Sequence, residues 1–117
     1  MKRHFVLPKH IRTVMCFLKS HTNEPICVDD LAHISGTSTR SLYLHFKNFL
    51  GMTPMEYVKE LRMERVRNEL LSGDANNIYK AATNAGFNHM GRFSRDYRQR
   101  YGENPRETLK ARMFQEE

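Results

Sequence analysis

Apolar residues recur along this chain with the spacing that one face of an α-helix requires. The first series is Ile11, Val14, Met15 and Leu18, and its i, i+3, i+4, i+7 spacing predicts an amphipathic helix over residues 9–21. Later series have the same period, and no segment has a convincing strand pattern. The sequence therefore predicts an all-α fold of about seven helices.

Two helix starts carry a capping signal. Thr53 and Glu56 have the spacing of a capping box, and Pro54 occupies the first helical position between them. This signal predicts a long helix from Pro54 to Leu71, which would span about 27 Å at about 1.5 Å per residue. Residues 104–107 repeat the signal and predict the last helix.

Two stretches of the chain resemble one another, which indicates an internal repeat. The matching pairs are Val28/Ile78, Ala32/Ala82, Gly36/Gly86, Leu42/Phe93, Phe46/Tyr97, Gly51/Gly102 and Pro54/Pro105. The first three pairs are 50 residues apart and the last four are 51 apart. The second copy therefore has one extra residue in or just after its turn.

Each copy has the features of a helix-turn-helix. Gly36 and Gly86 stand where a helix ends and the chain reverses, a position that favours a left-handed glycine. Ser38 and Asn88 follow, and we expect each to cap the next helix. The repeat also suits a helical hairpin that serves only packing, and this alternative stays open here.

The second helix of each copy has a predicted inward face. The inward residues are Leu42, Phe46 and Phe49 in the first copy, and Phe93 and Tyr97 in the second. We expect Phe87 to fill the space between the two helices of the second copy. The predicted organisation is a first helix-turn-helix subdomain over residues 9–53, a linker helix over 54–72 and a second subdomain over 73–114.

The net charge of the chain indicates which kind of partner it binds. The 117 residues carry a formal net charge of +6, which favours a polyanion. An anionic membrane is the competing partner, but no apolar run approaches the ~18 residues of a membrane span, and no signal peptide is visible. We expect a cytoplasmic protein that is associated with the nucleoid and does not bind membranes.

Signals of catalysis and metal binding are missing from the sequence. It has no glycine-rich phosphate loop, no nucleophile elbow and no plausible pair of catalytic carboxylates. Cys16 and Cys27 lack neighbours at metal-ligand spacing, and two cysteines make no disulfide framework. We expect no enzyme activity, no metal and no cofactor.

One set of residues in the second half has a recognisable arrangement. It comprises Ala82, Ala85, Gly86, Phe87, Phe93, Ser94, Arg95, Tyr97, Arg98, Tyr101, Gly102, Glu103, Asn104 and Pro105. In the first half, the corresponding residues are Leu31, Ala32, Gly36, Ser38, Leu42, Phe46, Lys47, Leu50, Gly51, Thr53 and Pro54. Together with Arg62, they resemble the DNA-binding module of the AraC/XylS family of bacterial transcription regulators, from about Ile11 to Leu109.

The resemblance implies a regulator of transcription that binds double-stranded DNA, with activation as the commoner behaviour and RNA polymerase as a partner. The module would be monomeric unless a further domain dimerises it. Successive major grooves on one face of DNA are about 34 Å apart, so the long helix could hold two recognition helices in neighbouring grooves. Leu44 departs from the pattern, since the family frequently has a base-contacting arginine there, and Gly91 interrupts the second recognition helix.

The first recognition helix has a candidate DNA-binding face opposite its inward residues. This face comprises Thr39, Arg40, Tyr43, Leu44 and Lys47. Arg40 can offer a bidentate fork to guanine, and Leu44 can pack against a thymine methyl group. Lys47 suits a phosphate. The exposed Tyr43 and Leu44 would also suit a contact with another protein.

The second recognition helix has a more cationic candidate face. Its outward or flanking residues are His89, Met90, Gly91, Arg92, Ser94, Arg95 and Arg98. By family position, Arg95 is the expected base-contacting residue, with Met90 and Gly91 beside it. Arg92, Arg98 and His89 suit phosphates.

Two alternatives to this binding face remain. The arginines at 92, 95, 98 and 100 could form only a solvated face, although their place on this helix favours binding. A protein-interaction adaptor without DNA binding is the second. A regulator should bind duplex DNA with an affinity that falls as the salt concentration rises, whereas the adaptor should not bind duplex DNA in this way.

Overall fold

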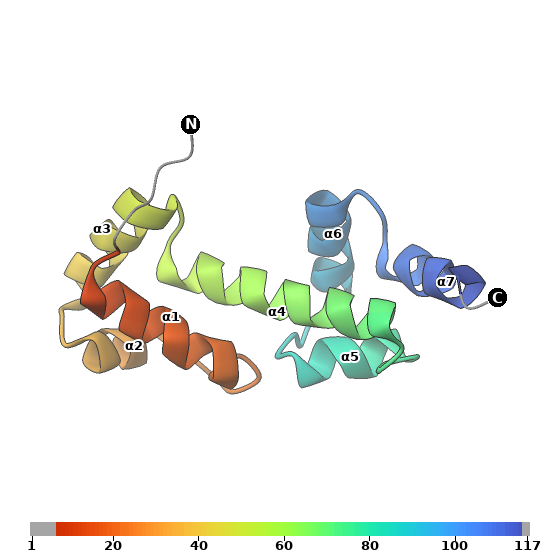
Figure 1. Cartoon of the computed structure of the whole chain (residues 1–117), viewed down its shortest axis with the longest axis horizontal. Helices are drawn as coiled ribbons and strands as arrows, with labels where there is room; N and C mark the ends of the chain where they lie inside the picture. The colour runs from red at the N-terminus through yellow and green to blue at the C-terminus, as the bar shows by residue number, and fades with distance from the viewer. Residues whose placement is uncertain (1–6, 116–117) are drawn as a thin grey trace. The chain divides into compact units, whose positions relative to one another are not determined.

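The computed structural model describes residues 7–115, and within that range it contains seven α-helices and no strand (Figure 1). The helices are α1 (Lys9–His21), α2 (Val28–Ser35), α3 (Thr39–Leu50), α4 (Pro54–Ser72), α5 (Ile78–Asn84), α6 (Met90–Tyr101) and α7 (Pro105–Gln115). The predicted all-α fold of about seven helices is confirmed.

The chain divides into two compact units that meet between Lys59 and Glu60, inside α4. In the first unit, α1, α2 and α3 pack together beside the start of α4 (Figure 1). In the second, α5, α6 and α7 accompany the remainder of α4. The predicted organisation into 9–53, 54–72 and 73–114 treats α4 as a separate segment and stays a prediction.

The core of the first unit consists of aliphatic and aromatic side chains from α1, α2, α3 and the start of α4. The fully buried members are Ile11, Val14, Leu18, Leu31, Leu42, Phe46 and Val58. The Tyr57 ring at the start of α4 lies 6.0 Å from the Phe46 ring, between centroids. The period of 3.6 residues therefore identified the buried face of α1 correctly, although Met15 on that face is only half-buried.

The core of the second unit is built on the later turns of α4. Its buried cluster comprises Met63, Val66, Leu70, Ala81, Ala82, Ala85, Phe93 and Tyr97. Phe87 packs against this cluster, with its ring centroid 4.8 Å from that of Phe93. The predicted inward positions of Phe93, Tyr97 and Phe87 are confirmed.

Phe49 is the predicted inward residue that the structure places elsewhere, because 45% of its surface is exposed. It lies in the last turn of α3, which has 12 residues against 8 in its neighbour α2. The apolar spacing of Phe49 with Leu42 and Phe46 therefore does not lead to its burial.

The two turns differ in how the next helix is capped. Gly36 has a φ of +77°, and Ser38 accepts a hydrogen bond from the Ser41 N–H at 3.1 Å, as predicted. In the second copy, the prediction that Asn88 caps the helix is wrong. The cap of α6 is His89, whose Nδ1 accepts from the Arg92 N–H at 3.1 Å. The extra residue of the second turn moves the cap to the position 51 residues after Ser38.

Both predicted capping boxes are present. The Thr53 N–H donates to Glu56 Oε1 at 2.8 Å, and the Glu56 N–H donates to Thr53 Oγ1 at 3.1 Å. Asn104 and Glu107 make the equivalent pair at 2.8 and 2.9 Å. The hydrogen bond from the Thr53 backbone lowers the pKa of Glu56, with a smaller contribution from nearby Lys47. These boxes satisfy amide groups that would otherwise lack partners at the start of α4 and α7.

Candidate nucleic-acid interface

The outward side of α3 carries all five residues that the sequence predicted for its DNA-binding face. Thr39, Arg40, Tyr43, Leu44 and Lys47 are exposed, opposite the buried side of the helix. Tyr43 and Leu44 each keep 46% of their surface exposed. Their contact with DNA stays a prediction.

A shallow groove of about 420 Å³ runs along this side of the first unit. It is lined by Val28, Thr39, Arg40, Tyr43 and Leu44. Val28 is the first residue of α2, so the groove lies where α2 begins beside the first turns of α3. Sequence reasoning did not include Val28, because its contribution depends on the packing of two helices.

The outward side of α6 is dominated by arginines. Arg92, Arg95 and Arg98 are exposed together with Gly91, and Ser94 is half-exposed. Met90 differs from the expected surface residue, because it is half-buried and packs against the core cluster. The first turn of α6 thus directs Met90 toward the protein and leaves Gly91 and the arginines outside.

His89 has a structural role that limits how it can meet a phosphate. Its Nδ1 accepts from the Arg92 N–H, so the ring proton belongs on Nε2 in this arrangement. His89 is exposed, and Nε2 is its remaining donor. The predicted phosphate contact by His89 would therefore use Nε2.

Arg100 belongs to the same arginine run but does not share the outward face. Its Nε donates to Glu60 Oε1 and Oε2 at 2.9 and 2.8 Å. Its guanidinium carbon lies 5.1 Å from the centroid of the Tyr101 ring. The hydrogen bond with Glu60 raises the pKa of Arg100. Arg100 therefore ties α6 to α4.

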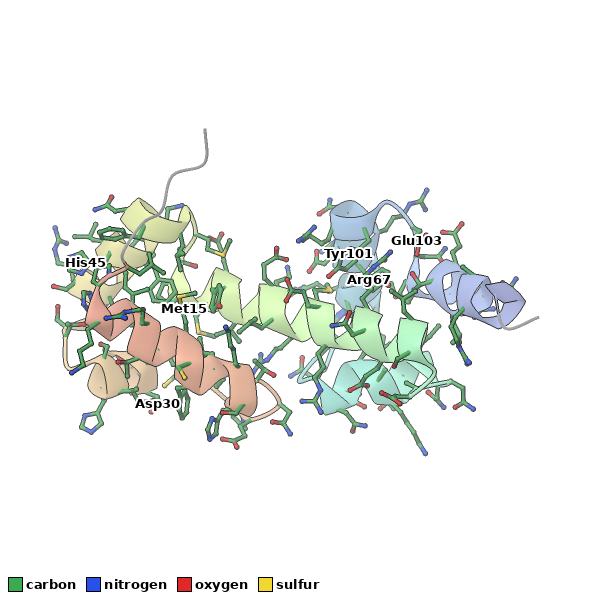
Figure 2. The ribbon with its side chains drawn as sticks, in the orientation of Figure 1. Met15, Asp30, His45, Arg67, Tyr101 and Glu103 are labelled. Carbon is green, nitrogen blue, oxygen red and sulfur yellow. The ribbon has the colours of Figure 1, made fainter. Side chains whose placement is uncertain are left out.

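A polar network inside the second unit fixes α6 against α4 and α7. The hydroxyl groups of Tyr97 and Thr108 lie 2.8 Å apart, and Arg67 Nη1 donates to Tyr97 at 3.3 Å and to Glu103 at 3.4 Å. Thr108 also donates to Glu103. Figure 2 shows Arg67, Tyr101 and Glu103 close together, with the Arg67 guanidinium carbon 4.4 Å from the Tyr101 ring centroid. Desolvation raises the pKa of Tyr101. The network orients the helix that carries the outward arginines.

Two amide side chains that the sequence reasoning missed lie on the same faces. Asn48 and Gln99 are exposed and 51 residues apart, the separation of the repeat. Each follows an outward residue, Leu44 or Arg95, by four positions and so lies one helical turn further on. Asparagine and glutamine can make bidentate hydrogen bonds to adenine. The same repeat spacing that revealed the helices could have revealed this pair.

The residues described by the structure include no group of three or more potential metal ligands among histidine, cysteine, aspartate and glutamate. Cys16 and Cys27 are exposed free thiols. Over the same range, every helix is too short or too polar to cross a lipid bilayer.

Comparison with known proteins gives a consistent result. Residues 31–111 match a family model described as a helix-turn-helix domain. The chain is 37% identical over 110 residues to the probable thc operon regulatory protein of Rhodococcus erythropolis. It is also 37% identical over 98 residues to XylDLEGF operon transcriptional activator 2 of Pseudomonas putida. These relatives are named as regulators of transcription and not as enzymes.

The relatives differ from this chain in length. The matched region covers 92% of the chain but 33% of the Rhodococcus protein, and 82% of the chain but 62% of the Pseudomonas protein. A solved structure of similar length also exists, that of a probable AraC family transcriptional regulator from Rhodopseudomonas palustris CGA009. It is 31% identical, with a TM-score of 0.84 over 90% of this chain and 98% of that chain.

Proposed function

This chain belongs to the AraC/XylS family of helix-turn-helix transcription regulators, and we propose that it activates transcription by sequence-specific binding to double-stranded DNA through the outward faces of α3 and α6. The observation that carries the proposal is that both recognition helices have the same arrangement of a buried face opposite a cationic face. Each recognition helix buries two residues of the repeat and exposes cations on the opposite side, Arg40 and Lys47 in α3 and Arg95 and Arg98 in α6.

The exposed residues divide by chemistry into base contacts and phosphate contacts. Arg95 has the bidentate donor geometry that suits guanine, while Asn48 and Gln99 suit adenine. Lys47, Arg92, Arg98 and His89 Nε2 supply positive or donor groups for phosphates. Thr39, Ser94 and the exposed backbone at Gly91 lie beside these contacts, and Met90 supports the first turn of α6 from the core side.

The two recognition helices are proposed to occupy successive major grooves of one duplex. The support for this is α4, a single helix of 19 residues whose two ends belong to different units. Such a helix spans about 28 Å. The expected operator is non-palindromic, with two half-sites about one helical turn, or about 10 base pairs, apart.

Activation and partners follow from the same reasoning. A named relative is a transcriptional activator of an operon, which supports activation by this chain. Contact with RNA polymerase is part of the proposal, because an activator must act on the transcription machinery. The unequal faces of α3 and α6 suit one copy bound to an asymmetric site, so the module should bind as a monomer. Chromosomal DNA as the target would place it at the nucleoid.

Selection of bound sequences from a random duplex pool, followed by titration at several salt concentrations, tests the proposal. The expected result is two half-sites and an affinity that falls steeply with salt, because the phosphate contacts would release counterions. A chain that binds no duplex, or binds without a salt slope, contradicts the proposal and favours a protein adaptor.

Arg95→Ala is the sharpest single variant for the second half-site. It should relax the preference at one base pair and weaken binding to the preferred site by about 1–3 kcal/mol, the usual value of a bidentate base contact. Lys110→Ala, which removes a charge from the exposed surface of α7 in the same unit, is the control. An unchanged preference profile in Arg95→Ala would reject its role as a base contact.

A further inference from the structure

The outward face of α3 contains an apolar surface that α6 lacks. Leu44 and Arg95 occupy equivalent positions, 51 residues apart, and both point away from the core. Leu44 is accompanied by Tyr43 and by the groove that Val28 completes. A helix that uses only charge and hydrogen bonds to bind DNA has no need of this surface.

We propose that this groove recognises the 5-methyl group of a pyrimidine in the major groove, so that the first unit distinguishes methylated from unmethylated pyrimidines. The inference rests on the proposed DNA binding and deepens it. Thymine and 5-methylcytosine both present this methyl group on the major-groove edge, where the other groups that distinguish the bases are hydrogen-bond donors and acceptors.

The shape and lining of the groove fit this group. Its volume of about 420 Å³ exceeds that of a methyl group, so the methyl group is not excluded by size. Val28 and Leu44 offer aliphatic carbon, and Tyr43 offers a ring, while none of the five lining residues is acidic. Burial of the methyl group should therefore be favourable, and the groove should not repel a nucleic acid.

The charges around the groove favour DNA as its occupant over an apolar peptide. Arg40 lines the groove itself, and Lys47 lies about two turns further along the same side of α3. Cations beside an apolar contact match a base edge that is flanked by phosphates. A protein partner with an apolar surface alone would leave both cations uncompensated.

Replacement of single thymines by uracil tests the inference, because uracil keeps the Watson–Crick pair and lacks the methyl group. The probe is the duplex selected above, and the readout is the dissociation constant of the full chain from fluorescence anisotropy. One replacement, in the half-site of the first unit, should weaken binding about fourfold, the effect of burying one CH₂-sized group. At that position, 5-methylcytosine should bind about fourfold better than cytosine, which separates the methyl group from the rest of the base.

Leu44→Ala connects this effect to the groove. Leu44 is exposed and alanine is a strong helix former, so the variant should keep its fold. It should reduce the uracil effect to nearly onefold, while Arg95→Ala, the matched variant of the second unit, should retain the effect in full. Leu44→Arg should replace the methyl preference by a preference for guanine at the same position.

The outcomes separate failure of this inference from failure of DNA binding itself. Salt-dependent binding with no response to any uracil replacement would overturn the methyl contact and leave the DNA-binding function standing. A full uracil effect in Leu44→Ala would also overturn it. If the Leu44→Ala variant bound every duplex with the same dissociation constant as the unmodified chain, the result would instead favour a protein contact at the groove. Absence of binding to any duplex overturns both.

Discussion

The two recognition helices are copies of one repeat, yet they expose different chemistry at equivalent positions. In α3 the outward side presents Arg40, Leu44, Lys47 and Asn48, and in α6 it presents Gly91, Arg95, Arg98 and Gln99. The cation at the third shared position is kept, as Lys47 and Arg98, while the second position changes from Leu44 to Arg95. A repeated fold can therefore keep its buried face while the chemistry of its outward face changes.

The buried cores of the two units also differ in chemistry at equivalent positions. Phe46 in the first unit and Tyr97 in the second are equivalent and fully buried. Phe46 has only apolar atoms, whereas the hydroxyl of Tyr97 contacts Thr108 and Arg67. The first unit therefore depends on packing, and the second adds a hydrogen-bond network that involves α7.

The largest expected effect concerns packing in the first unit. Phe46→Ala should lower the free energy of unfolding by about 3–5 kcal/mol, because it removes a buried aromatic ring and leaves a cavity. Phe49→Ala on the same helix is the matched control and should cost about 1 kcal/mol or less, since Phe49 is half-exposed. Denaturant titration followed by circular dichroism measures both. Equal losses would contradict the assignment of Phe49 to the surface.

The turns offer the next test of the difference between the units. Gly36→Ala should destabilise by about 1–2 kcal/mol because its φ of +77° disfavours a side chain, while no atom lies within 4 Å of an added Cβ. Gly86→Ala should cost about 1 kcal/mol more, since its φ is +105° and the new Cβ would lie 2.9 Å from Arg62 Nε.

A double-mutant cycle isolates the contact at Gly86. Combining Gly86→Ala with Arg62→Ala should recover part of the loss, because the truncated side chain no longer meets the added Cβ. Thermal or denaturant unfolding measures the coupling. Additive losses would show that backbone conformation alone accounts for the preference for glycine.

Removal of the Tyr97 hydroxyl tests the hydrogen-bond network in the second unit. Tyr97→Phe makes this position resemble Phe46 and should cost about 1–2 kcal/mol, because Thr108 and Arg67 lose a partner. Phe46→Tyr is the reverse variant, and it should also destabilise, by placing a hydroxyl in an apolar site. A neutral Tyr97→Phe would mean that the network adds nothing to the stability of the second unit.

The smallest effect is a pH dependence confined to the first unit. His10 Nε2 and His45 Nδ1 lie 2.7 Å apart, and desolvation, followed by the neighbouring His45, lowers the pKa of His10 from its ordinary value of 6.5. The folded state then binds this proton less well than the unfolded chain. The corresponding stability is present above pH 6.5 and is lost as the pH falls through the lowered pKa.

The histidine effect is measured as the unfolding midpoint against pH. His10→Gln should flatten the dependence just below the ordinary pKa of histidine, whereas His33→Gln, on the exposed side of α2, should leave it unchanged. The lowered pKa of Glu56 acts in the same direction at more acid pH, so the unfolding midpoint of both variants should still fall there. A profile of His10→Gln that matches that of the unmodified chain would remove the pair as the cause.

Local signals in the sequence determined the helices and most of their ends. Ser38 and the capping boxes at 53–56 and 104–107 satisfy nearby amide groups, which are hydrogen bonds within one turn of the chain. The period of 3.6 placed Leu42, Phe46, Phe93 and Tyr97 on buried faces. Most of the outward residues followed as the opposite faces of the same helices, and the family resemblance followed from the repeat.

Only the tertiary structure decided which of these side chains are buried and which pair with side chains of other helices. Phe49 is exposed despite its apolar spacing, and Arg100 donates hydrogen bonds to Glu60 of α4. Val28 joins the groove of α3 only through the packing of α2. Helix period and caps depend on residues within one turn of the chain, whereas exposure and ion pairing depend on which side chains of other helices lie nearby.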